Sequence, residues 1–375
     1  MRFLHLHSSF HAGGKELRAA KLINAFGRRV SHTIVSAQPE ALGAASAIDS
    51  KIDVDYPGDF PPLAGAPLPG RLQRLAQALA GFDLVLTYNW GAMDGVMAHT
   101  LFGKKLGLPP LVHHEDGFNE DEANRLKSSR NWYRRIALGR ASALVVPSQR
   151  LEAIALGVWQ QPSWRVQRIA NGIDTAAYRA KPPRDVLPRL IKRPGELWLG
   201  TLAGLRAVKD LPAMVRAFSG LPEEWQLVIL GDGPEREAIA AEAMRLNLAH
   251  RVHLPGFVAD PAKACGLFDL FALSSRSEQF PISVVEAMAT GLAIAAPAVG
   301  DIAGMVADVN RRFITLPGDE AAFGAAMLEL AKDQKLRQLI GSANREKAFR
   351  EYDGNAMINA YRAVYSGAMQ RDMPR

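Results

Sequence analysis

Residues 267–291, LFDLFALSSRSEQFPISVVEAMATG, contain a short apolar run, a polar loop and the beginning of a helix. The run 267–273 is typical of a buried strand. Pro281 suits the first turn of a helix, where its missing N–H costs nothing, and Gly291 suits the helix end. This segment therefore predicts a strand, a loop and a helix, which is the repeating unit of an open parallel sheet.

Two carboxylates stand eight positions apart in this segment, Glu278 in the loop and Glu286 inside the helix. Between them lies the N-terminus of the helix, whose free N–H groups suit a phosphate. One carboxylate on each side of a phosphate can hold two sets of hydroxyls, such as a sugar and a ribose, and a nucleotide-sugar carries all of these groups. On spacing alone, the pair also fits one surface glutamate and one solvated helix glutamate.

The same alternation of short apolar runs and amphipathic segments continues through the chain, which predicts an α/β protein with two Rossmann-like halves. A proline-rich, charged stretch at 181–195 separates the halves and is typical of a linker. The predicted strands are 3–7, 32–36, 84–88, 111–114, 143–147 and 166–170 in the first half, and 197–203, 226–230, 252–254, 270–273, 293–296 and 313–316 in the second.

Composition agrees with a two-domain globular protein, because 375 residues with 48% hydrophobic content allow two cores. Cys265 is the only cysteine, so no internal disulfide is possible, and we expect a cytoplasmic protein. No apolar run reaches the roughly 18 residues of a membrane span. The charge is uneven: residues 1–190 hold 24 Lys and Arg against 16 Asp and Glu, while residues 191–375 hold 21 against 22.

The basic first half suggests an anionic partner, such as a membrane or a phosphorylated acceptor. Residues 125–140 carry six Lys and Arg with interleaved aromatic residues. This segment fits either a helix lying on an anionic leaflet, which would place the protein on the inner face of the membrane, or a solvated basic face. A nucleic-acid partner is not expected, because no nucleic-acid module accompanies the charges.

Two short segments in the first half lie at the ends of predicted strands, at the sheet edge where open α/β sheets bind ligands. Gly13 and Gly14 follow the first strand and would let backbone approach a ligand. The run 113–116, HHED, ends a later strand. Either His113 or His114 fits a hydrogen bond to a sugar hydroxyl, and both also fit a local structural role. Glu115 and Asp116 fit an acceptor as base or hydrogen-bond partner.

The motif of Glu278, seven residues, Glu286 and then Ala-Met-Ala-Thr-Gly resembles the signature of the retaining glycosyltransferases of family 4, which have the GT-B fold. Gln279 stands where a glycine is usual in that family. The turn 171–174, NGID, resembles the family's turn before the linker. The resemblance implies an acceptor domain over 1–180, a donor domain over 196–350, and a last helix within 351–375 that crosses back to the first domain, with the two domains facing across a cleft.

The resemblance also assigns site residues. It implies that Lys209 neutralises the donor diphosphate; the usual arginine position is Gly204, and Arg206 lies two residues further on. It gives Glu286 the ribose diol and Glu278 the donor-sugar hydroxyls, and it places one of the two histidines at the reacting sugar. The remaining donor residues that it implies are Gly13, Gly14, Phe257, Val258, Phe280, Pro281, Ile282 and Ser283.

The activity that this resemblance implies is transfer of a sugar, with retained configuration, from a nucleoside diphosphate sugar such as a UDP-sugar to a glycan or lipid-linked acceptor, in cell-surface polysaccharide synthesis. We expect no metal cofactor, because the Asp-x-Asp match at Asp53 and Asp55 lies away from the donor elements and no Cys/His spacing suggests zinc. The alternatives are a catalytically degenerate nucleotide-binding protein, a GT-B epimerase or phosphorylase, and a membrane-surface scaffold.

Overall fold

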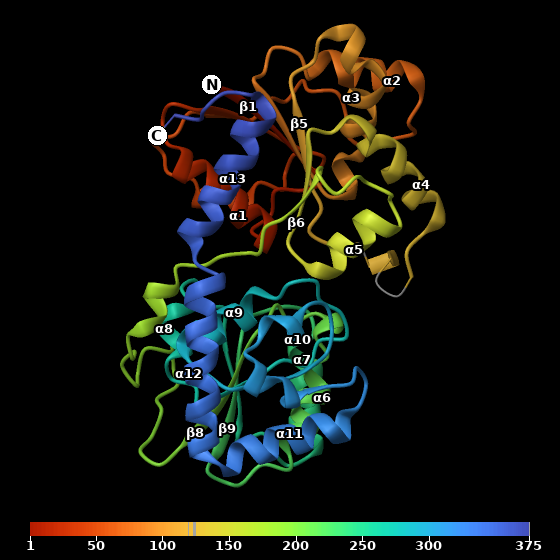
Figure 1. Ribbon diagram of the computed structural model, residues 1–375. Coiled ribbons are helices and arrows are strands. Elements are labelled where there is room, and N and C mark those ends of the chain that lie inside the picture. The colour runs from red at the N-terminus through yellow and green to blue at the C-terminus, as the bar shows by residue number, and fades with distance from the viewer. Residues whose placement is uncertain (119, 123–124, 375) are drawn as a thin grey trace. The chain divides into compact units, whose positions relative to one another are not determined.

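The computed structural model describes residues 1–118, 120–122 and 125–374. The chain forms two compact units (Figure 1). Unit 1 comprises Met1–Ala170 together with the segment from Met357 onward, and unit 2 comprises Asn171–Ala356. No helix in the described ranges combines the length and the apolar content needed to cross a membrane.

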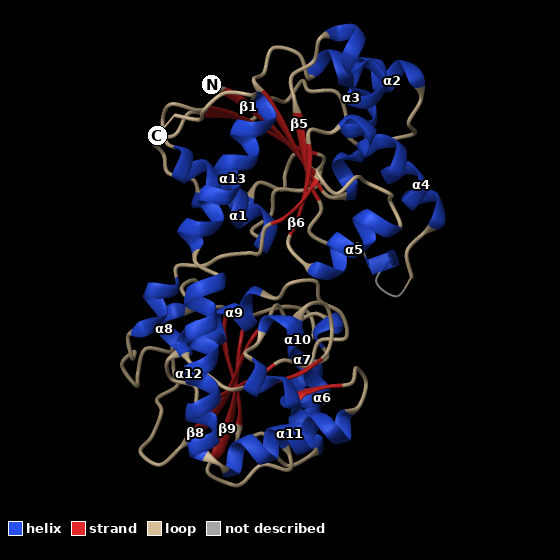
Figure 2. Ribbon diagram, viewed as in Figure 1, coloured by secondary structure: helices blue, strands red, loops and turns tan. Residues whose placement is uncertain are grey.

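Unit 1 contains a parallel sheet in the order β3-β2-β1-β4-β5-β6-β7, with helices on both faces (Figure 2). Its strands are β1 Arg2–His7, β2 Ser31–Ser36, β3 Val54–Asp55, β4 Leu84–Tyr88, β5 Leu111–His114, β6 Ala143–Val146 and β7 Val166–Arg168. Its helices are α1 Gly14–Phe26, α2 Pro69–Ala78, α3 Met93–Leu106, α4 Ser128–Ala137, α5 Gln149–Gly157 and most of α13 Gly354–Met369.

The two faces of this sheet form separate cores because successive side chains of a strand point to opposite sides. On β1, Leu4 and Leu6 join the core under α2, α3 and α5, whereas Phe3 joins the core under α1 and α13. Tyr361 and Tyr365 of α13 are fully buried in that second core. The last helix is therefore an integral part of unit 1.

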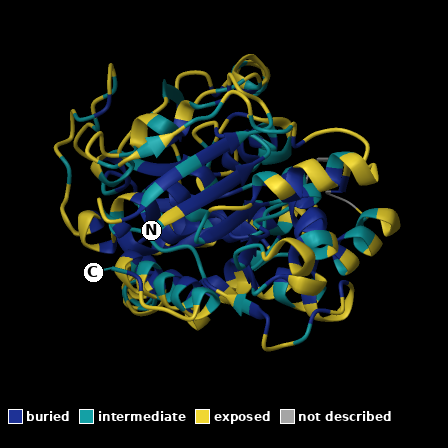
Figure 3. Ribbon diagram, turned by 90° about the horizontal axis from the view of Figure 1, so that it is seen from above, coloured by how far each residue is buried: buried dark blue, intermediate teal, exposed yellow. Residues whose placement is uncertain are grey.

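Unit 2 contains a second parallel sheet, in the order β10-β9-β8-β11-β12-β13. Its strands are β8 Leu197–Leu202, β9 Trp225–Leu230, β10 Val252–Gly256, β11 Leu270–Ala272, β12 Ile294–Pro297 and β13 Ile314–Thr315. Its helices are α6 Leu211–Phe218, α7 Arg236–Arg245, α8 Ala262–Cys265, α9 Ile282–Thr290, α10 Ile302–Met305, α11 Glu320–Lys332 and α12 Gln334–Glu351. Figure 3 shows buried strands, in dark blue, surrounded by helices and loops that carry the exposed residues.

The predicted α/β fold with two parallel sheets is confirmed. The segment 181–195, predicted as a linker, lies within unit 2. Leu187 is buried there, and the Lys192 ammonium donates to the carbonyl of Leu267 and to the carboxylate of Asp269, both at 2.6 Å. Apolar and charged side chains among the prolines thus attach this stretch to unit 2.

Candidate functional site

Most of the predicted donor residues of unit 2 follow β8 or β11 in the chain, which are neighbouring strands at the centre of the sheet. The strand order reverses at this point: β9 and β10 extend to one side of β8, and β12 and β13 extend to the other side of β11. Open parallel sheets bind ligands in the crevice that forms at such a switch point. The loop after β8 carries Arg206 and Lys209, and the loop after β11 carries Glu278.

Lys209 and Glu278 form an ion pair across this switch point. The side chains are 17% and 12% exposed, so both charges are close to solvent but largely enclosed. Ser275 donates from its hydroxyl to the same oxygen of Glu278 at 2.7 Å, and Ser274 donates to the carbonyl of Lys209 at 2.8 Å. The two loops are thus fixed to each other, and the cation and the carboxylate that the sequence predicts for one ligand do lie together.

Glu286 is the fifth residue of α9, and its carboxylate accepts a hydrogen bond from the hydroxyl of Tyr178 at 2.9 Å. Burial raises the pKa of Glu286 above its ordinary value, while the hydrogen bond from Tyr178 acts in the opposite direction. The buried thiol of Cys265 lies nearby. Burial, and to a smaller extent the charge of Glu286, raises the pKa of this thiol, so the thiol stays protonated. A carboxylate held by one neutral donor can accept further hydrogen bonds from a diol.

Arg206 is exposed and precedes the short 3₁₀ helix Ala207–Lys209. Its side chain turns back over Gly204: a Cβ atom built on Gly204 would lie 3.7 Å from the Arg206 Nε atom. The guanidinium therefore lies next to the position that a side chain at residue 204 would occupy.

Phe280 and Pro281 lead into α9, where Pro281 is the N-cap and Ile282 the first helical residue. As the first residues of the helix, Ile282 and Ser283 cannot donate their N–H groups to a preceding turn, so these groups are available to an anion. The Phe280 ring is buried against Tyr352, with ring centroids 5.5 Å apart. This contact fixes the chain just before the helix.

Phe257 and Val258 follow β10, and the Phe257 ring is 76% exposed. The preceding turn is tied to the neighbouring loop by a hydrogen bond from the N–H of Gly231 to the carbonyl of Gly256 at 2.9 Å. Gly231 has φ of 146°, and a Cβ atom there would lie 1.8 Å from the carbonyl oxygen of Ala203. Only glycine permits this approach of the loops after β8, β9 and β10.

In unit 1, Gly13 is the N-cap of α1 and Gly14 is its first residue. A Cβ atom on Gly13 would lie 2.7 Å from a carboxylate oxygen of Glu16, which is itself paired with Lys15. The absence of a side chain at Gly13 therefore lets Glu16 fold back over the start of the helix.

His113 and His114 point to opposite faces of the sheet, and both are buried. His114 uses both ring nitrogens inside unit 1, with Nδ1 at 3.1 Å from the carbonyl oxygen of Thr87 and Nε2 at 2.8 Å from the hydroxyl of Tyr365. His113 uses Nδ1 with the Thr87 hydroxyl at 2.8 Å, and its Nε2 has no hydrogen bond among the described residues. Of the two, only His113 has a ring nitrogen without a hydrogen bond, and that buried nitrogen lies 3.8 Å from a carboxylate oxygen of Glu115.

Glu115 and Asp116 are held in internal ion pairs and do not form an open acceptor site. Glu115 is fully buried and lies 3.2 Å from the Nε atom of Arg134. Asp116 accepts two hydrogen bonds from Arg18, one of them at 2.8 Å. Burial alone would raise the pKa of Asp116, but the Arg18 guanidinium outweighs burial and keeps the pKa below its ordinary value.

The basic segment 125–140 forms α4 and a following 3₁₀ turn, but its charges do not all face solvent. Arg134 is fully buried and pairs with Glu122 at 3.1 Å, as well as with Glu115. Arg130 also pairs with Glu122 and with Asp121. The exposed face of α4 instead presents Trp132 and Ile136, which are 61% and 52% exposed.

Three residues beside the predicted site were not singled out from the sequence: Ser274, Ser275 and Tyr178. The serines lie within the quoted 267–291 segment, and a polar residue three positions before Glu278 is a local signal that could have identified Ser275. Tyr178 lies 108 residues from Glu286 along the chain, and no spacing rule connects them.

Comparison with known proteins relates both halves of the chain to glycosyltransferases. The model of Glycosyltransferase Family 4 matches residues 12–177, and that of Glycosyl transferases group 1 matches residues 189–347. The N-acetyl-alpha-D-glucosaminyl L-malate synthase of Bacillus anthracis is 25% identical over 214 residues, covering 56% of each chain. The phosphatidyl-myo-inositol mannosyltransferase of Mycobacterium leprae is 29% identical over 203 residues, covering 52% of each. The matched region thus spans about half the length of these curated relatives.

Among solved structures, Anabaena Alr3699/HepE in complex with UDP superposes with a TM-score of 0.77 at 19% identity, covering 98% of this chain and 100% of the other. The same protein in complex with UDP-glucose gives a TM-score of 0.76. These likenesses confirm the predicted GT-B fold, and with the two family models, which together extend from residue 12 to residue 347, they show that the chain belongs to the family 4 glycosyltransferases.

Proposed function

We propose that this protein is a retaining glycosyltransferase whose unit 2 binds a nucleoside diphosphate sugar and whose unit 1 binds the acceptor. The observation that carries the proposal is the enclosed pair of Lys209 and Glu278 beside the N-terminus of α9. A cation and free N–H groups suit a diphosphate, and a carboxylate next to them suits the hydroxyls of the attached sugar.

Each side chain then has a chemical role. Glu286 accepts hydrogen bonds from the ribose diol, and Glu278 does so from hydroxyls of the donor sugar. As the bond between the sugar and the diphosphate oxygen breaks, both electrons leave with that oxygen, and Lys209 and Arg206 stabilise the negative charge that develops there. The acceptor oxygen forms its bond to the sugar carbon on the same face, and its proton passes to an oxygen of the departing diphosphate.

The donor is proposed to be a UDP-sugar, since Anabaena Alr3699/HepE was solved with UDP and with UDP-glucose. The backbone near Phe257 and Val258 would contact the base, and His113 is the candidate for contact near the reacting sugar. Because Lys209 and Arg206 supply the cationic groups, we propose that no metal is required. The names of two relatives include an inositol lipid and a lipopolysaccharide core, which supports a glycan or lipid-linked acceptor and a role at the cell surface.

A turnover assay separates this proposal from its alternatives. With UDP-glucose and related donors, we expect release of UDP and a glycoside of retained configuration by NMR, both unchanged by EDTA. A degenerate binding protein would bind UDP without releasing it from any donor. A phosphorylase would depend on inorganic phosphate, and an epimerase would give an altered sugar nucleotide. Either of these two results would contradict the proposal.

Arg206 offers a specific test, because its side chain lies over Gly204. Arg206→Ala is expected to lower kcat/KM roughly 10²-fold, since it removes one donor to the developing charge. The double variant Gly204→Arg, Arg206→Gly should recover most of this loss, because the guanidinium returns to the same place from the neighbouring position. An Arg206→Ala variant with wild-type kcat/KM would show that this guanidinium has no part in the reaction.

We also propose that the exposed face of α4 touches an anionic membrane. Trp132 and Ile136 project there, and the Arg135 guanidinium lies 5.1 Å from the Trp132 ring centroid. Trp132→Ala should weaken sedimentation with phosphatidylglycerol-containing vesicles about 30-fold, because burial of an aromatic ring is worth roughly 2 kcal/mol. Leu101→Ala on α3, where Leu101 is 55% exposed, is the control. Equal vesicle binding by both variants would exclude α4 as the contact.

A further inference from the structure

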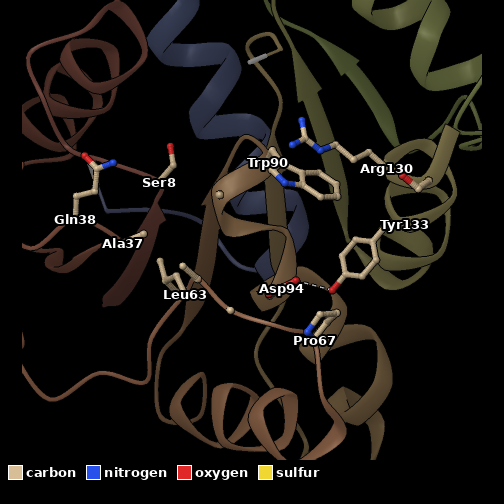
Figure 4. A pocket seen from close by; sticks show the side chains of 13 residues that line it. Ser8, Ala37, Gln38, Leu63, Pro67, Trp90, Asp94, Arg130 and Tyr133 are labelled. Carbon is tan, nitrogen blue, oxygen red and sulfur yellow. Dashed lines mark hydrogen bonds between the residues drawn. The ribbon is translucent and has the colours of Figure 1, made fainter. Parts of the chain in front are cut away.

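Unit 1 contains a pocket of about 570 Å³ at the carboxyl edge of its sheet (Figure 4). Ser8 follows β1, Gln38 follows β2, and Trp90 follows β4, so the pocket lies where β1 and β4 are neighbours and the strand order reverses. Arg130 and Tyr133 of α4 line the opposite side. This is the switch point of the sheet of unit 1. Glu115 and Asp116, which the sequence assigned to an acceptor, do not line the pocket.

The backbone around the pocket is specifically shaped. Asn89, which precedes Trp90, has φ of 55° and ψ of −172°, a conformation that costs energy for a residue other than glycine. Its side-chain oxygen accepts from the N–H of Asp116 at 2.8 Å, which holds the turn. A Cβ atom on Gly91 would lie 2.2 Å from the Cβ atom of Ser8, so only glycine brings these two loops together.

The charged groups that face the pocket are already neutralised by protein partners. Asp94 accepts from Arg71 and from the hydroxyl of Tyr133, both at 2.6 Å. Arg130 donates to Asp121 and Glu122 at 2.9 Å. A charged ligand would have to break one of these arrangements, so the pocket offers no uncompensated charge to either a cation or an anion.

The uncharged groups, in contrast, are available. Among the described residues, the side chains of Ser8 and Gln38 and the indole N–H of Trp90 have no hydrogen-bond partner within the protein. Trp90 itself is firmly held, with the Arg130 and Arg134 guanidinium groups within 4.9 Å of its ring centroid and the Tyr133 ring centroid at 5.6 Å. Rigid aromatic walls with unpaired neutral donors and acceptors suit a ring that carries hydroxyl groups.

We propose that this pocket binds the acceptor through an uncharged polyol ring, a sugar or a cyclitol. The inference rests on the proposed function, which assigns the acceptor to unit 1, and it adds the chemical class. Hydroxyls of the ring would bond to Ser8, Gln38 and the Trp90 indole, and to the oxygens of Asp94, while the ring itself packs against Trp90 and Tyr133.

The test uses two matched variants on α4. Ser128 and Ser129 are adjacent and exposed, but Ser129 lines this pocket whereas Ser128 lines a separate one. Ser129→Trp therefore places an indole at the pocket, and Ser128→Trp places the same bulk beside it. We would measure saturation-transfer difference NMR of myo-inositol and methyl α-D-glucopyranoside, with L-malate and inorganic phosphate as charged probes.

We expect at least one of the polyols to give a signal with the wild type and Ser128→Trp, and at least a 5-fold loss with Ser129→Trp. Gln38→Ala should weaken binding about 3-fold without filling the pocket. No polyol signal with the wild type, an unchanged signal in Ser129→Trp, or pocket-dependent binding of malate or phosphate instead would overturn the proposal. UDP titration of the same samples tests unit 2 separately: polyol binding without UDP binding would reject the donor proposal and leave the pocket intact.

Discussion

Replacing Lys209 by alanine is expected to lower kcat/KM for sugar transfer by roughly 10³-fold, or about 4 kcal/mol of transition-state stabilisation. The reason is that the Lys209 ammonium lies at the switch point of unit 2, paired with Glu278 and only 17% exposed. A fixed cation in such an enclosed place stabilises the leaving diphosphate far more than an ion in water would. Steady-state kinetics with a UDP-sugar donor measures the loss.

The matched control is Lys263→Ala, which removes an ammonium from an exposed position on α8 of the same unit. Lys209→Arg should recover part of the activity because it restores the charge. Since Lys209→Ala also leaves Glu278 without its partner, thermal unfolding of each variant separates lost catalysis from lost fold. A well-folded Lys209→Ala enzyme with activity near that of Lys263→Ala would exclude the proposed role.

Acidification from pH 7.5 to 5.5 is expected to destabilise unit 1 by about 5 kcal/mol, which is a large part of the stability of a typical domain. The cause is a buried group of four histidines next to α1 and α13: His5, His7, His32 and His114. His5 Nε2 lies 2.9 Å from His32 Nδ1, His5 Nδ1 lies 3.1 Å from the Tyr88 hydroxyl, and the His7 ring stacks on Tyr88.

Each of these histidines has a pKa below its ordinary value, and burial is the main cause. The pKa is lowered to about 4 for His32 and to about 3 for His114. In the unfolded chain each takes up a proton near pH 6.5, whereas the folded chain does not. Stability is therefore complete above pH 6.5 and falls as the pH falls below it, by about 1.4 kcal/mol per histidine at pH 5.5.

Hydrogen exchange followed by mass spectrometry can measure this effect for the two units separately. Unit 2 has only His250 and His253, so its protection should change much less. His11→Ala, at an exposed position, should leave the acid sensitivity of unit 1 unchanged. Equal loss of protection in both units would show that the buried histidines do not cause the acid sensitivity.

Much of the fold was predictable from the sequence because buried parallel strands are apolar and short. All twelve predicted strands overlap strands of the structure. The strand that was missed, β3, has two residues, Val54 and Asp55, which are too few to show a period. The prolines and charges of the segment 181–195 did not indicate that Leu187 is buried, because this burial depends on tertiary packing.

The candidate site was predictable only where its residues are close in sequence or follow adjacent strands. Glu278 was found from its spacing to Glu286, and Lys209 was found through the family resemblance; in the structure both follow strands that meet at the centre of the sheet. The segment 113–116 follows the same rule and was placed at the correct edge, but its carboxylates pair with Arg18 and Arg134, which lie in other helices. The pocket beside Trp90 collects residues from five separate segments, so no local pattern could reveal it.

The central claim is that Glu278, Lys209 and Glu286 form a site for a nucleoside diphosphate sugar, and calorimetric titration with UDP, ADP and GDP tests it most directly. We expect one nucleotide, UDP by preference, to bind the wild type, and Glu286→Gln to weaken that binding at least 10-fold. Glu237→Gln on α7 should bind as the wild type does. Absence of binding by every nucleotide, or equal affinity in Glu286→Gln and the wild type, would contradict the account.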